Sequence, residues 1–235
     1  MDRVSILTDP LLVDRLGLLH RHTETVGHLI EDVDIDVVLI SHGHHDHLHP
    51  PSLRRIRGRP RFVVPPGLGR LVSRYGHDVV ELAAGERCEI GGVEVRAIRA
   101  EHDGRRRPFG PSAEALSYRI AGSSRLYFAG DTDLCPEMDD LARTVDVALL
   151  PVWGWGPRLG TGHLDPGRAA EAVRRLRPRI AIPIHWGTFY PFAFARFWPH
   201  PLGDPPREFA QEALRVAPET EVRVLEPGEG TELGG

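Results

Sequence analysis

Short apolar runs alternate with polar segments that contain glycine or proline along the first third of the chain. Residues 4–8 and 61–64 are apolar stretches that end before prolines, which is typical of short strands. Residues 36–41 form a continuous apolar run, as in a strand covered on both faces. The pattern also predicts a helix over residues 50–56, opened by two prolines, and another over residues 68–75.

Beyond residue 79 the pattern changes to strands separated by glycine-rich turns. We expect strands at residues 79–82, 87–90, 93–100, 116–120 and 125–129. Helices at residues 136–142, 166–176 and 206–214 then alternate with strands at residues 146–150, 179–184 and 222–225. This order predicts two packed sheets with helices outside, in one domain over residues 1–235, with a frayed Gly- and Glu-rich tail at 227–235.

The composition is that of an ordinary globular protein. Of 235 residues, 41% are hydrophobic and 26% charged, enough to bury a large core without disulfides. The net charge of -4 argues against binding to nucleic acid or anionic membranes. With two cysteines, no signal-peptide pattern and no run of about 18 apolar residues, we expect a cytoplasmic chain without a membrane span. The sequence is also compatible with a homo-oligomer.

Four histidines gather directly after the predicted strand at 36–41, in the segment His42-Gly43-His44-His45-Asp46-His47. Residues two apart in an extended chain point the same way, so His42 and His44 can reach one metal. Gly43 is expected to let the backbone turn sharply. Asp46 and His47 can then face a second metal. His45, on the opposite face, is expected to meet solvent or a hydrogen-bond partner.

Three further candidate ligands follow other predicted strands: His102, Asp131 and His185. Polar residues at the ends of several strands are how sheet scaffolds build sites. Imidazole and carboxylate without thiolate favour a catalytic metal site over a structural zinc site. The alternative is a His-rich surface loop that binds metal loosely, and the recurrence at strand ends weighs against it.

Three segments resemble the successive motifs of the metallo-β-lactamase superfamily: Ser-His-Gly-His-His-Asp-His at 41–47, Ala-Gly-Asp-Thr at 129–132 and Pro-Ile-His-Trp-Gly-Thr at 183–188. The segments Leu-Thr-Asp-Pro at 7–10 and Gly-His-Leu-Asp-Pro at 162–166 are similar to the branch of the L-ascorbate-6-phosphate lactonase and the N-acylphosphatidylethanolamine phospholipase D. The resemblance extends from residue 5 to about 190. It implies a four-layer αβ/βα sandwich of two mixed β-sheets with outer helices.

Family members usually open with an extra strand before the Leu-Thr-Asp-Pro segment. This chain starts after that strand, either because the start codon is misassigned or because the first strand is missing. We therefore expect one sheet edge, and part of the floor of the site, to differ from the family pattern.

The same resemblance implies two divalent cations, zinc or alternatively manganese. The first would be held by His42, His44 and His102, the second by Asp46, His47 and His185, with Asp131 bridging both. His163 matches a family position that faces substrate beside the metals. Its alternative role is that of a histidine packed ahead of the helix that begins at Pro166.

Two metals would lower the pKa of a shared water, and the resulting hydroxide would attack a small anionic ester, lactone or phosphoester. Asp46 would orient this nucleophile, and His163 would donate to the oxyanion or the leaving group. Arg158 is expected to bind a negative group of the substrate, and Trp153 and Trp155 to form an apolar wall or, alternatively, to be core aromatics. The run of arginines at 105–107 suits phosphate recognition or a solvated surface.

Three other functions compete with a small-molecule hydrolase. A nucleic-acid processing phosphodiesterase of this fold would need a basic stripe, which the sequence lacks. A non-hydrolytic relative would use one iron, and the presence of Asp46 and His47 argues for two metals. The third alternative, a regulator that binds metal but has no activity, is also compatible with the sequence.

Overall fold

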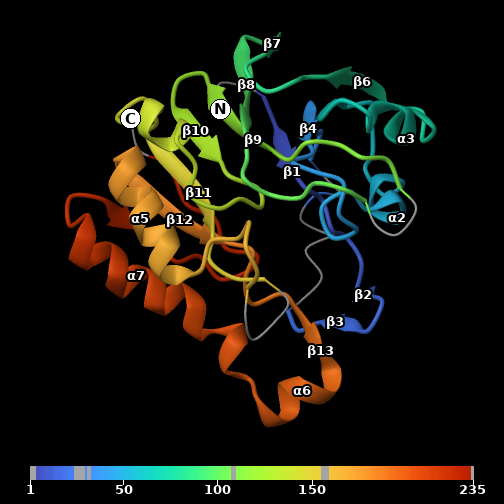
Figure 1. Ribbon diagram of the computed structural model, residues 1–235. Coiled ribbons are helices and arrows are strands. Elements are labelled where there is room, and N and C mark those ends of the chain that lie inside the picture. Colours follow the sequence, from blue (N-terminus) through green and yellow to red (C-terminus); the bar gives the residue numbers. More distant parts are fainter. Residues whose placement is uncertain (1–3, 24–29, 31–32, 107–109, 155–158, 234–235) are drawn as a thin grey trace.

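The computed structural model describes residues 4–23, 30, 33–106, 110–154 and 159–233. Their strands form a four-stranded, a seven-stranded and a three-stranded sheet (Figure 1). The four-stranded sheet has the order β1-β4-β5-β6, with β1 (Ile6–Thr8), β4 (Val37–Leu39), β5 (Arg61–Val64) and β6 (Asp78–Glu81). All its pairings are parallel, because connections that contain helices carry the chain from β4 to β5 and from β5 to β6. A mixed sheet was predicted here.

The seven-stranded sheet has the order β14-β12-β11-β10-β9-β8-β7. Its strands are β7 (Arg87–Ile90), β8 (Val93–Arg99), β9 (Leu116–Ala121), β10 (Arg125–Phe128), β11 (Val147–Pro151), β12 (Ile180–Ile184) and β14 (Glu221–Val222). The meander from β7 to β10 is antiparallel, whereas β10, β11, β12 and β14 run parallel. This sheet is therefore mixed, as predicted.

Helices cover the outer face of each large sheet (Figure 1). They are α2 (Pro50–Leu53), α3 (Gly69–Ser73), α4 (Glu137–Asp140), α5 (Pro166–Leu176) and α7 (Asp204–Val216), with a 3₁₀ turn at His200–Leu202. The start of α5 follows from its sequence, since the Asp165 carboxylate accepts a hydrogen bond of 2.8 Å from the Arg168 N–H and Pro166 occupies the first turn. No helix in the described part of the chain is long and apolar enough to cross a bilayer.

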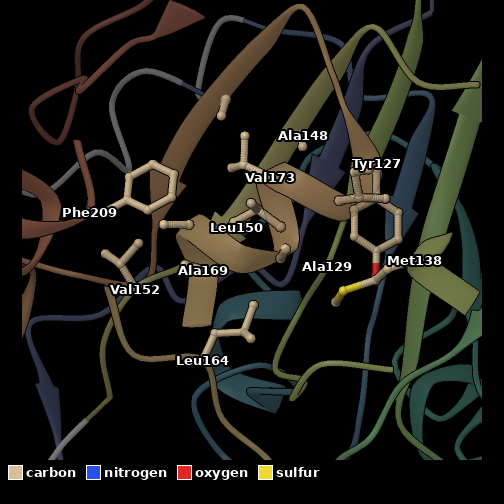
Figure 2. Close-up of a cluster of buried hydrophobic side chains, with 14 of the residues drawn as sticks. Tyr127, Ala129, Met138, Ala148, Leu150, Val152, Leu164, Ala169, Val173 and Phe209 are labelled. Atoms are coloured by element: carbon tan, nitrogen blue, oxygen red, sulfur yellow. The ribbon is translucent and has the colours of Figure 1, made fainter. Parts of the chain in front are cut away.

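Three apolar clusters join these layers into a four-layer sandwich. Between the two sheets, Val37 and Leu39 of β4 pack in one cluster with side chains of β8 and β9. Outside the seven-stranded sheet, Leu150 of β11 packs with Val173 of α5 and Phe209 of α7 (Figure 2). A third cluster joins the other face of the four-stranded sheet to α2 and α3. The predicted fold class is confirmed.

A small third sheet extends from the sandwich near one end, at the bottom of Figure 1. It consists of β2 (Arg15–Leu16), β3 (Leu19–Arg21) and β13 (Phe189–Pro191), followed by helix α6 (Phe192–Phe197). The sequence pattern predicts none of these elements. In the described part of the tail, Arg223 donates to the carbonyl of Glu232 at 2.7 Å and Leu233 packs near Val147.

Candidate metal centre

The seven predicted ligands meet at the ends of strands from both large sheets. The segment 42–47 follows β4, His102 follows β8, Asp131 follows β10 and His185 follows β12. Because parallel neighbouring strands end at the same edge of a sheet, residues far apart in sequence reach one place. The structure therefore brings together every residue of the predicted ligand set.

His42, His44 and His102 form the first group. Nδ1 of His44 lies 2.9 Å from Nε2 of His42 and 3.2 Å from Nε2 of His102. On its far side, His102 donates through Nδ1 to the Gly162 carbonyl at 2.7 Å. Burial lowers the pKa of all three imidazoles, most strongly that of His42, so these rings are held in the neutral form that binds metals.

Asp46, His47 and His185 form the second group. Nε2 of His47 lies 3.2 Å from Nε2 of His185 and 3.4 Å from a carboxylate oxygen of Asp46. Burial disfavours charge on the His47 and His185 rings, but the carboxylates of Asp131 and Asp46 outweigh it and raise the pKa of both. Burial likewise opposes ionisation of Asp46 and Asp131, yet the two rings hold the pKa of each carboxyl well below its ordinary value.

Asp131 lies between the two groups. Its Oδ2 atom is 3.3 Å from Nε2 of His47 and 4.0 Å from Nε2 of His42, and its Oδ1 atom is 3.5 Å from Nε2 of His185. The side chain is buried and faces rings of both groups. This position suits a ligand shared by two cations.

The donor atoms fit metal ions better than they fit one another. The Gly162 carbonyl can only accept, so the proton of the neutral His102 ring lies on Nδ1 and the lone pair of Nε2 faces the first group. Three imidazole nitrogens that converge within about 3 Å cannot all be satisfied by a shared proton. A cation satisfies them all, and nitrogen with carboxylate oxygen is the ligand set of zinc and its neighbours. Both groups could hold a metal ion.

Arg106 holds the ligand segment in place. Its guanidinium donates to the carbonyls of Gly43 and Leu48 at 2.9 Å and 2.6 Å, and lies 2.9 Å from Nδ1 of His45. His45 is exposed and hydrogen-bonded, as the sequence predicts. The sequence analysis predicted that the arginines at 105–107 recognise phosphate or form a solvated surface. Arg106 instead binds backbone carbonyls of the ligand segment. Arg105 forms an exposed ion pair with Asp103, and residue 107 lies outside the described residues.

Two glycines allow the close packing around the ligands. The backbone bends at Gly43, as predicted, and the glycine also allows close approach, because a Cβ there would lie 2.9 Å from the carbonyl oxygen of Gly104. Gly130 has φ +59°, and a Cβ there would lie 2.5 Å from Cβ of Ser41.

Asp9 and Ser41 are site residues that the sequence analysis does not identify. The Asp9 carboxylate accepts hydrogen bonds from the backbone N–H and the hydroxyl of Ser41, at 2.7 Å and 2.5 Å, and from Nδ1 of His47 at 2.7 Å. Nδ1 of His42 lies 2.9 Å from the Ser41 hydroxyl oxygen. The signals that the sequence offers for Asp9 are its position at the end of a strand, before Pro10, and the resemblance of the Leu-Thr-Asp-Pro segment to the family.

His163 lies beside the first group. Its ring is 4.7 Å from that of His102, edge to face, and its Nδ1 atom is buried with no hydrogen-bond partner among the described residues. Its ligand atoms can also join His102 and Asp131 in a candidate metal group. The ring therefore faces the ligands, although it also precedes α5 by only a few residues.

A cavity of about 340 Å³ lies against the second group, between the two sheets. Asp46, His47 and His185 form one side of it, and apolar side chains that include Leu7, Phe128, Trp153 and Trp186 form most of the rest. The predicted wall residue Trp153 is thus buried beside the ligands. Two other predicted substrate-binding residues, Trp155 and Arg158, lie outside the described residues.

Comparison with known proteins gives this arrangement a family. Residues 5–186 match the family described as the beta-lactamase superfamily domain. The chain belongs to the metallo-β-lactamase superfamily. This superfamily member is a metal-dependent hydrolase of the metallo-β-lactamase fold, with His and Asp groups that could hold metal.

Its relatives include a metal-dependent hydrolase of Methanopyrus kandleri, 30% identical over 239 residues, which cover 99% of this chain and 94% of that protein. The N-acyl-phosphatidylethanolamine-hydrolyzing phospholipase D 1 of Caenorhabditis elegans is 27% identical over 227 residues, which are 86% of this chain and 64% of that protein. A solved metallo hydrolase of Ignicoccus hospitalis shares the fold of this superfamily member, with a TM-score of 0.71, 24% identity and coverage of 97% and 90% of the two chains.

Proposed function

We propose that this metal-dependent hydrolase binds two divalent cations, one in each group of ligands, with Asp131 shared between them. The ligands would be His42, His44 and His102 for the first cation and Asp46, His47 and His185 for the second. The observation that carries the proposal is the position of the Asp131 carboxylate between rings of both groups. Zinc is the expected metal, with manganese as the alternative.

Bound divalent cations would supply an activated water and a Lewis acid for the oxygen of the scissile bond. Within the chain, Asp46 is placed to orient the attacking water and accept its proton, because its charged carboxylate lies at the second group. His163 would donate a hydrogen bond to the negative charge that develops on the substrate, a role supported by its ring, which lies edge to face against that of His102 and near Asp131. Asp46 and His163 are thus the proposed catalytic residues.

We infer that the substrate is a small anionic ester, lactone or phosphoester. The apolar cavity beside the second group supports a substrate with an apolar part, bounded by Trp153. Arg21 lines the same cavity, and its buried guanidinium, which donates to the Leu11 and Val13 carbonyls, adds positive charge there. Similarity to the Caenorhabditis elegans phospholipase D supports a phosphodiester as the bond that is cleaved. Arg158 and Trp155 stay sequence-based predictions for substrate contact.

Elemental analysis combined with a substrate panel tests the proposal. Wild-type protein reconstituted with zinc should bind two ions per chain and hydrolyse at least one of a phosphodiester, a lactone and a carboxylic ester bearing a chromogenic leaving group. His44→Ala should lose metal and activity, whereas His45→Ala, in the same segment but outside both groups, should keep both. One iron per chain would contradict the binuclear site. Two bound metals without turnover of any substrate class would favour a regulator without activity.

A further inference from the structure

Arg21 places a buried positive charge in the wall of the cavity beside the second metal group. This wall is mainly apolar, apart from the side formed by Asp46, His47 and His185. Arg21 comes from β3 of the small third sheet, and its side chain is only 4% exposed. A charged side chain is rarely buried without a charged partner. The contacts of Arg21 therefore indicate what its charge is for.

Two contacts hold the Arg21 guanidinium in one orientation. Along one edge, Nε donates to the Val13 carbonyl at 3.1 Å and Nη2 donates to the Leu11 carbonyl at 2.6 Å. One face lies over the Phe189 ring, with Cζ 4.6 Å from the ring centroid. These bonds use two of the five guanidinium N–H groups, and neither involves Nη1. The N–H groups left over include the pair at the end of the fork, which matches two oxygens of a carboxylate or phosphate.

The charge of Arg21 is only weakly balanced by the described residues around it. The Asp14 carboxylate lies 3.9 Å from Nε, on the edge that already binds the carbonyls, and its side chain is 70% exposed. Ion pairs screened by solvent in this way contribute little. Burial has the largest effect on the pKa of Arg21 and lowers it; Asp14 opposes this shift without cancelling it, and the charge of Arg55 adds to it. An anion inside the cavity would balance the charge of Arg21 better than Asp14 does.

The cavity thus has metal ligands on one side, a cationic fork elsewhere in its wall, and apolar side chains over most of the rest. Its volume of about 340 Å³ is at the lower end of the range for ligand pockets, roughly 300–1,000 Å³. We propose that Arg21 binds a second anionic group of the substrate, at the end of an apolar arm that fills this cavity while the scissile bond lies at the metals. The proposal rests on the two-metal function above and deepens it, because it names the substrate class: an ester, lactone or phosphoester whose apolar arm ends in a carboxylate or phosphate.

A purely structural role for Arg21 predicts a different response to substitution. In that role the side chain serves only to bind carbonyls of the segment 11–13, as Arg55 does by donating to the Leu12 carbonyl. Arg55 is exposed and is not among the described residues that line the cavity. Substitution of either arginine would then lower stability without changing which ligands bind. A role in binding predicts a ligand preference that depends on Arg21 and not on Arg55.

Calorimetric titration of the zinc-loaded protein with short acids tests the proposal without turnover. Butanedioate, hexanedioate and octanedioate are each compared with the monoacid of the same length, butanoate, hexanoate or octanoate. Diacid and monoacid can both place one carboxylate at the metals, but only the diacid has a second one for Arg21. In wild type at least one diacid should bind roughly 10–100-fold more tightly than its monoacid, the effect of a hydrogen bond to a charged group.

Arg21→Gln removes the charge but keeps an amide donor for a backbone carbonyl. The preference for the diacid should therefore disappear, whereas the affinity for the monoacid should stay as in wild type. Arg55→Gln is the matched control, because it makes the same chemical change on the same segment outside the cavity, and it should keep the preference.

Each outcome bears on one of the two proposals. The role of Arg21 is overturned if no diacid is preferred in wild type, if the preference survives in Arg21→Gln, or if Arg55→Gln loses it equally. If Arg21→Gln does not fold, a crystal structure of zinc-loaded wild type with the tightest-binding diacid replaces it: one carboxylate must contact Nη1 and Nη2 of Arg21, and its placement elsewhere overturns the role. Elemental analysis of the same samples tests the proposed function separately. Fewer than two zinc ions per chain would contradict that function, whereas two ions without a diacid preference overturn only the role of Arg21.

Discussion

The guanidinium of Arg106 donates a hydrogen bond of 2.6 Å to the carbonyl of Leu48, across 58 residues of sequence. A second bond to the carbonyl of Gly43 attaches the other end of the ligand segment to the same side chain. Arg106 therefore fixes the segment that supplies four of the seven proposed ligands.

Arg106→Ala should lower the free energy of unfolding by about 2–3 kcal/mol, because a charged donor is lost and two carbonyls keep no equivalent partner. Urea denaturation measures the change. Arg105→Ala is the matched control, since that side chain is exposed and only pairs with Asp103, and its effect should stay within about 0.5 kcal/mol. Equal effects of the two substitutions would show that the carbonyl bonds do not stabilise the fold.

Asp131→Ala should remove most of the bound metal, because both ions lose a shared ligand and the rings of His47 and His185 lose a neighbouring charge. His163→Ala should keep the metal content near that of wild type. Elemental analysis after exhaustive dialysis compares the two variants. Equal loss of metal would place His163 in the ligand set, a role that its proximity to His102 and Asp131 also permits.

His163→Ala should lower kcat by about 10²–10⁴-fold, the usual contribution of a group that moves a proton or donates to developing charge. KM should change little, because the contact strengthens only as charge develops in the transition state. Steady-state kinetics on whichever substrate class shows turnover provides the measurement. A rise in KM at constant kcat would instead make His163 a ground-state binding residue.

Gly130→Ala should destabilise the protein by several kcal/mol, because its backbone is left-handed and the added methyl would overlap Ser41. Gly230→Ala is the control, since an added Cβ there meets nothing within 4 Å. Thermal unfolding of the two variants provides the comparison. A Gly130→Ala protein as stable as wild type would mean that Gly130 and Ser41 can move apart without loss of stability.

Local signals in the sequence predict the elements that local interactions form. Helix α5 spans residues 166–176 as expected, because an Asp side chain caps its start and proline occupies its first turn. Strands β5 and β7 also match their predicted ranges, since each is an apolar or alternating run that ends at prolines or glycines. The candidate metal ligands stand out for a similar reason, because their spacing and their position after predicted strands can be read directly from the sequence.

What the sequence does not reveal depends on contacts between distant segments. Strands β2, β3 and β13 have two or three residues each, too few for any periodicity, and β13 pairs with a strand about 170 residues earlier in the chain. The bonds of Arg106 to carbonyls likewise exist only after the two sheets have packed, and the bond of Asp9 to His47 only after β1 has paired with β4. The bend at Gly43 was predictable, but its close approach to Gly104 is set by tertiary structure.

The proposed ligands come from both large sheets, so metal ions bound by them would also stabilise the contact between the sheets. His44 and His102 are 58 residues apart in the chain, and His47 and His185 are 138 apart. Two cations, one held by each pair, would each close a long loop, much as a disulfide cross-link does, and would restrict the unfolded chain more than the folded one. Each bound ion also stabilises the folded state by mass action. A chelator should therefore lower the Tm as well as abolish turnover. The proposed metal centre would then also act as a cross-link between the two large sheets.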